Sequence, residues 1–91
     1  MKLSTFERRA DEATSNLFAF AKFVAETEDL SGDSRYAAAW LEAEVVNAAA
    51  LEAWDAQGRP QEWNDEWQRN FKAEATEVVA QLREVIKAVF D

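Results

Sequence analysis

Residues that break helices are scarce in this chain. The 91 residues include two glycines and one proline, Gly32, Gly58 and Pro60, which divide the chain into three segments. Alanine, glutamate, leucine, glutamine, lysine and arginine are frequent, and these residues have high helix propensity. No stretch alternates apolar and polar residues over several positions, which is the pattern of a half-buried strand. The sequence therefore predicts an all-α protein with three helices.

The first helix is expected over residues 5–28. Ser4 and Glu7 have the spacing of a capping box, in which each side chain accepts a hydrogen bond from an unpaired backbone N–H group. Apolar residues then recur at intervals of four and three, which places them in one stripe along the helix. The stripe consists of Phe6, Ala10, Ala13, Leu17, Phe20 and Val24. A turn is expected at residues 30–33.

The second helix is expected over residues 34–57. Asp33 or Ser34 can cap its start, and Gly58 suits the position just after its end. At 100° per residue the helix has a wide face without charge, formed by Tyr36, Ala39, Trp40, Ala43, Val46, Asn47, Ala50, Ala53 and Trp54. A second apolar line lies almost opposite and consists of Ala37, Leu41, Val45 and Ala48. Either this helix is the centre of the bundle, or one side of it meets another chain.

The third helix is expected over residues 60–90, with Pro60 in its first turn. Its apolar stripe consists of Trp63, Trp67, Phe71, Ala75, Val78, Leu82, Val85 and Val89. Short connections make successive helices run antiparallel. The sequence therefore predicts a single domain, residues 1–91, folded as an up-down-up antiparallel three-helix bundle with a long C-terminal helix.

Acidic residues are concentrated in the middle of the chain. Residues 26–66 hold eleven acids and two bases, a net charge of −9, whereas the two flanking segments together sum to +1. Such a field attracts basic surfaces and repels nucleic acid and anionic membranes. The segment is either a solvated face, or a patch that binds a basic protein surface by imitating a nucleic-acid backbone, or a cation site.

Few residues in this chain are suited to catalysis. The chain has no His and no Cys, the commonest general base and the thiol nucleophile. It has no Gly-rich phosphate loop and no metal-ligand spacing. We therefore expect no enzymatic activity, no cofactor and no metal. The longest apolar run, residues 36–41, has six residues, far short of a membrane span, and no signal peptide is visible, so we expect a cytoplasmic protein.

The aromatic residues of the third segment have two interpretations. Trp63 and Trp67 lie beside acids at the start of the longest helix, where they are either covered by the rest of the bundle or exposed as an anchor for a basic partner. The second interpretation predicts a partner-binding surface on the second and third helices. Its residues are Glu42, Glu44, Glu52, Asp55, Glu62, Trp63, Asp65, Glu66 and Trp67.

In broader character the chain resembles the small acidic proteins that phages and mobile elements direct against host machinery, such as anti-CRISPR proteins and DNA mimics. The resemblance rests on the size, the missing His and Cys, the helical composition and the acidic segment. It implies an inhibitor that occupies the basic site of a host nucleic-acid-handling protein in the host cytoplasm, without contacting nucleic acid or membrane itself.

Two other functions are compatible with the sequence. In the first, the protein is a structural or assembly subunit that forms a homodimer through the second helix, with Leu41, Val45 and Ala48, with or without Phe18, buried between the chains. In the second, it is a small adaptor that sequesters a regulatory protein without imitating nucleic acid. Sedimentation tests the first function, and competition by DNA separates an adaptor from a mimic.

Overall fold

The computed structural model describes residues 2–30 and 32–90; Ser31, which the expected turn includes, lies outside them. These described residues form five helices: α1 (Leu3–Ala13), α2 (Leu17–Thr27), α3 (Ser34–Ala56), α4 (Asn64–Asn70) and α5 (Lys72–Phe90). No described residue belongs to a strand, and the expectation of an all-α protein is confirmed. Within the described residues, no helix is both long and apolar enough to cross a membrane.

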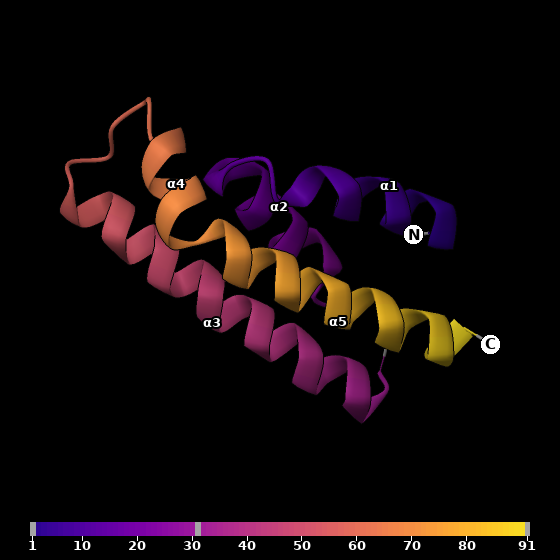
Figure 1. The fold of residues 1–91 in the computed structure, drawn as a ribbon. Helices are drawn as coiled ribbons and strands as arrows, with labels where there is room; N and C mark the ends of the chain where they lie inside the picture. The colour runs from indigo at the N-terminus through magenta and orange to yellow at the C-terminus, as the bar shows by residue number, and fades with distance from the viewer. Residues whose placement is uncertain (1, 31, 91) are drawn as a thin grey trace.

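The helices lie along an elongated molecule that measures 42 × 22 × 19 Å. Figure 1 shows α1 running toward the end that carries α4, α2 running back, α3 running toward α4 again and α5 returning. The longest helices, α3 and α5, lie side by side, and α1 packs against both α2 and α5. The start of α1 and the end of α5 both lie toward the end of the molecule opposite α4 (Figure 1). The up-down-up three-helix arrangement is therefore not confirmed.

The expectation of one helix over residues 5–28 is wrong, because the chain reverses direction between α1 and α2. The rings of Phe6 and Phe23 are 5.4 Å apart, whereas a continuous helix would separate these residues by about 25 Å. Asn16 is the N-cap of α2, and its side-chain oxygen accepts a hydrogen bond from the backbone N–H of Ala19 at 2.8 Å. Polar side chains such as this one bond to nearby backbone groups and so compete with helix continuation.

The apolar stripe of this segment is nevertheless buried along its whole length. Each of its six residues is at most 2% exposed. Since α1 and α2 face each other, the stripe is divided between the inner faces of a helical hairpin. The expected capping box is absent: Lys2 is the N-cap of α1 and makes no side-chain capping bond. Glu7 instead accepts hydrogen bonds from Arg83 of α5 at 2.7 and 2.9 Å.

The ends of α3 have the expected capping residues. The Asp33 carboxylate accepts a hydrogen bond from the backbone N–H of Arg35 at 2.8 Å and pairs with the Arg35 guanidinium at 3.0 Å. After the helix, Gly58 has a φ of 87°, in the left-handed region that glycine adopts at little cost, and its N–H donates to the Asp55 carbonyl at 3.0 Å. These contacts explain why the helix occupies Ser34–Ala56.

The Asp33 cap makes stability depend on pH. The hydrogen bond from the Arg35 side chain lowers the pKa of Asp33 from 3.8 to about 2. A carboxyl group whose pKa is depressed by folding stabilises the fold above its unfolded pKa and loses this contribution as the pH falls through its folded pKa. We therefore expect Asp33 to make the free energy of unfolding decrease between about pH 4 and pH 2.

Urea unfolding at a series of pH values checks this expectation. Asp33→Asn keeps a good N-cap residue without a titrating carboxyl group, so it should flatten the acid part of the stability profile, with a stability close to wild type near pH 2 and below wild type at pH 7. Arg35→Gln removes the charged partner and should flatten the same part. Unchanged slopes in both variants would contradict the assignment to this pair.

The expected third helix, residues 60–90, is also interrupted. Residues 60–63 lie outside any helix, and Phe71 separates α4 from α5 with a φ of −129°. The backbone ladder continues through this point, because Phe71 donates to the Trp67 carbonyl at 3.0 Å and accepts from Ala75 at 2.9 Å. The chain thus bends at Phe71 without reversing. The Phe71 ring stacks with those of Trp63 and Trp67, at centroid distances of 5.7 and 6.4 Å.

Candidate protein-binding surface

The two tryptophans of the expected binding surface belong to the core. Trp67 is 0% exposed and Trp63 is 5% exposed. The Trp67 indole N–H donates to the Thr14 carbonyl at 3.0 Å, and its ring lies 5.6 Å from that of Phe20. The Trp63 indole N–H donates to the Gln57 side chain at 2.8 Å. Of the two interpretations, the covered one is correct, because the chain reversal before α2 brings Thr14 and Phe20 over this end.

Three of the expected acids gather around the start of α4. Glu62, Asp65 and Glu66 line one surface hollow together with Arg69, and we call these four residues the acidic hollow. Glu66 accepts hydrogen bonds from Arg69 at 3.3 Å and from Asn70 at 2.7 Å. Glu62 and Asp65 are exposed and form no ion pair within the described part of the chain. Three carboxylates and one guanidinium leave the acidic hollow with a net charge of −2.

An exposed aromatic ring lies beside the acidic hollow. Glu62 also lines a neighbouring depression, whose other lining residues include Asn16, Leu17 and Phe18 of the α1–α2 hairpin. Phe18 is 50% exposed and rests edge-on against Trp54, with centroids 5.3 Å apart. Sequence periodicity places Phe18 away from the apolar stripe, which is the signal for an exposed ring. Its position beside Glu62 depends on the hairpin and could not be read from the sequence.

The acids of α3 do not join the acidic hollow as one patch. Glu42 and Glu44 lie about 200° apart around the helix, so they occupy different flanks. Glu44 accepts a hydrogen bond of 3.5 Å from Asn47, and Asp55 is paired with Arg59. Glu52 is exposed and makes no ion pair with the described residues. The acids that are concentrated in residues 26–66 of the sequence therefore gather only partly on one surface of the folded chain.

A second acidic region was missed because part of it lies outside residues 26–66. Glu42 faces Glu74 and Glu77 across a groove between α3 and α5, which Val46 and Val78 also line. The sequence did contain a signal for this region. Glu74 and Glu77 are three residues apart in the third segment, and this spacing places both side chains on one face of a helix.

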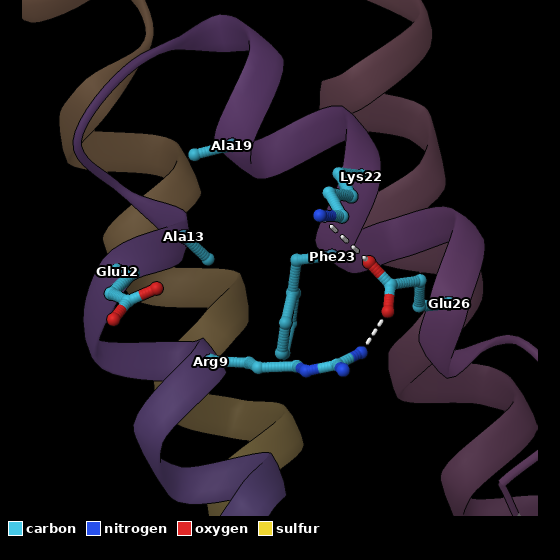
Figure 2. Close-up of a pocket in the computed structure, with 7 residues that line it drawn as sticks. All are labelled: Arg9, Glu12, Ala13, Ala19, Lys22, Phe23 and Glu26. Carbon is cyan, nitrogen blue, oxygen red and sulfur yellow. Dashed lines mark hydrogen bonds and ion pairs between the residues drawn. The ribbon is translucent and has the colours of Figure 1, made fainter.

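A further pocket, between α1 and α2, is not acidic. Figure 2 shows Arg9 of α1 and Lys22 of α2 both directed toward Glu26, with the Phe23 ring extending toward Arg9. Arg9 forms a hydrogen-bonded ion pair with Glu26, and the Lys22 ammonium lies 4.0 Å from the same carboxylate. Glu12 completes the lining with a second carboxylate, so two bases balance two acids. These contacts join the two helices and neutralise an acid of the 26–66 segment.

No described residue that lines the acidic hollow or the pocket of Figure 2 is a Ser, Thr, Cys or His. Among the described residues, no group of three His, Cys, Asp or Glu side chains is arranged to hold a metal ion. What the surface offers is exposed carboxylate, both in the acidic hollow, which has an aromatic ring at its edge, and in the groove lined by Glu42, Glu74 and Glu77. Comparison of the chain with protein-family models, with curated proteins and with solved structures finds no significant match.

Proposed function

We propose that the protein binds a basic surface of another protein through the acidic hollow and Phe18. The observation that carries this proposal is that no described residue forms an ion pair with Glu62 or Asp65, both exposed in a hollow of net negative charge. An incoming Arg or Lys can pair with these carboxylates without breaking an existing ion pair. At Asp55 and Glu26 the same contact would have to displace an arginine.

The two kinds of contact contribute differently to binding. Charge steers the encounter, so it affects mainly the association rate and the dependence on salt. Phe18 supplies the apolar contact in place of the buried tryptophans, and its half-exposed ring can also receive a cation on its face. Loss of this ring should act mainly on the dissociation rate.

The partner we propose is a nucleic-acid-handling protein whose basic groove the chain occupies, so that the protein acts as an inhibitor. Grooves that hold phosphates carry Arg and Lys side chains at a spacing that clustered carboxylates can also satisfy. The negative charge of the whole chain, −8, favours such a partner and disfavours direct contact with nucleic acid or membrane.

Competition tests this proposal. The immobilised protein is incubated with a bacterial lysate, the captured proteins are eluted with rising salt, and they are identified by mass spectrometry. Addition of a short DNA duplex should release the specific partner, because duplex and protein would share one site. A partner that stays bound at saturating duplex would contradict the inhibitor and favour an adaptor that sequesters a regulatory protein.

A further inference from the structure

The groove between α3 and α5 is lined by valines. Val46 and Val78 are each 8% exposed and lie where the two helices meet, whereas Val45, on the α3 side, is 63% exposed. The α5 residues that line the groove run from Glu74 to Gln81, so the groove is about two helical turns long, roughly 10 Å. Because α3 and α5 lie side by side and run in opposite directions (Figure 1), a third helix can lie along the groove between them.

The charged residues of this groove all have the same sign. Glu42 on α3 and Glu74 and Glu77 on α5 are exposed, and no described residue forms an ion pair with any of them. The described lining contains no Lys or Arg, so the groove has a net charge of −3. A neutral or acidic partner that covered the valines would remove these carboxylates from water without compensation. The charge of the groove is therefore complementary to a basic partner alone.

We propose that the groove binds a basic amphipathic helix of a partner protein. The apolar stripe of the bound helix lies on the valines. Lys or Arg residues on the two edges of that stripe pair with Glu42 on one side and with Glu74 and Glu77 on the other. Lys and Arg suit these positions, because their methylene stems cover apolar surface while their charged ends reach the carboxylates.

Hydrogen bonding favours a helix over an extended segment in this groove. Carboxylates accept hydrogen bonds and valine side chains make none, so Gln81 supplies the one side-chain donor among the described lining residues. An extended segment would place its own carbonyl groups against this lining with few donors to satisfy them, whereas a helix satisfies its backbone groups internally. The occupant is therefore a helix with its apolar side toward the groove.

A synthetic peptide serves as the probe. It is a helix of about four turns, with a stripe of Leu flanked on both sides by Lys, and a fluorophore reports its binding by anisotropy at 0.15 M salt. A peptide of the same composition in scrambled order, and one with prolines in its centre, should both bind at least about tenfold more weakly. Equal affinity of the scrambled peptide, or of the proline peptide, would overturn the proposal.

Two triple variants locate the binding site of the peptide. The first neutralises the acids of the groove and is Glu42→Gln, Glu74→Gln, Glu77→Gln. It should weaken binding at least about tenfold. The matched control neutralises three other exposed acids that form no ion pair with described residues and is Glu12→Gln, Glu28→Gln, Asp29→Asn. Equal loss in both variants would mean that net charge alone attracts the peptide, and the proposal would be wrong.

A single substitution tests the apolar contact. Val45→Ser should weaken binding of the peptide about fivefold, because it removes exposed apolar surface on the α3 side of the groove. Leu3→Ser is the matched control, since Leu3 is a partly exposed apolar residue of α1 and does not line the groove. Equal affinities of Val45→Ser and Leu3→Ser would contradict the placement of the helix on the valines.

The described linings of the groove and of the acidic hollow share no residue, so the two proposals can fail separately. The variant Glu62→Gln, Asp65→Asn, Glu66→Gln should bind the peptide as the control triple variant does. Loss of binding in this variant, with binding retained when the groove is neutralised, would place the peptide in the acidic hollow and overturn the inference about the groove. Amide shifts at the groove that grow with the concentration of the protein alone would show that a second copy occupies it instead.

Discussion

Replacing Trp67 by alanine should lower the free energy of unfolding by about 3–5 kcal/mol, the range found for large aromatic residues removed from cores. Trp67 has no exposed surface, and its ring lies against those of Phe20 and Phe71. Its N–H group also bonds to the Thr14 carbonyl, so the residue connects α4 to the α1–α2 hairpin. Such a loss is a large fraction of the stability of a domain of this size. Urea unfolding followed by circular dichroism measures it.

Two further variants make this prediction specific. Trp67→Phe keeps an aromatic ring and removes the N–H group, and we expect a loss nearer to 1–2 kcal/mol from the unmade hydrogen bond and the reduced volume, as an order of magnitude. Trp54→Ala removes a half-buried ring and should cost less than Trp67→Ala. Wild-type stability of Trp67→Ala together with lost partner capture would show that Trp67 is an exposed anchor, contrary to its placement here.

The second large effect is expected at the acidic hollow. The triple variant Glu62→Lys, Asp65→Lys, Glu66→Lys converts a site of net charge −2 into one of +4. Capture of the basic partner should fall at least about tenfold at 0.15 M salt, and the difference should shrink as salt rises, because screening weakens exposed charges. Reversing the charges of Asp65 and Glu66 in the first turn of α4 lowers the stability of that helix. The helicity of the variant is therefore measured together with its capture of the partner.

The matched control changes the same total charge elsewhere. Glu28→Lys, Asp29→Lys, Glu84→Lys reverses three exposed acids that form no ion pair with described residues and lie away from α4. If binding depends on the acidic hollow, the control should retain most of the capture. Equal loss in both triple variants would mean that net charge alone governs capture, and the proposed surface would be wrong.

The faces of the helices could be predicted because they depend on local periodicity. The stripe from Phe6 to Val24 is buried as expected, and so is most of the charge-free face of α3. The reversal at Asn16 could not be predicted, because Thr14, Ser15 and Asn16 tolerate a helix as well as a turn. The reversal depends on a capping bond from Ala19, and the Trp67 hydrogen bond to Thr14 then holds the end of the hairpin.

The sequence predicted which kinds of residue form the candidate site better than it predicted where those residues lie in the fold. Glu62, Asp65 and Glu66 are close in sequence and belong to one short region, so they lie together. Glu42 and Glu44 are also close in sequence, but helix geometry turns them to different flanks of α3. The α1–α2 hairpin determines the burial of Trp63 and Trp67 and the position of Phe18. These features could therefore be learned only from the folded structure.

Amide chemical-shift mapping tests most directly the claim that the acidic hollow is the binding surface. The ¹⁵N-labelled protein is titrated with the partner recovered by salt elution. The largest shifts should fall on residues 61–69 and on Phe18, and the indole signal of Trp63 should move more than that of Trp40, which bonds to the Val24 carbonyl of α2. Shifts confined to the α1–α2 pocket around Glu26, or to the end of the molecule opposite α4, would contradict the account.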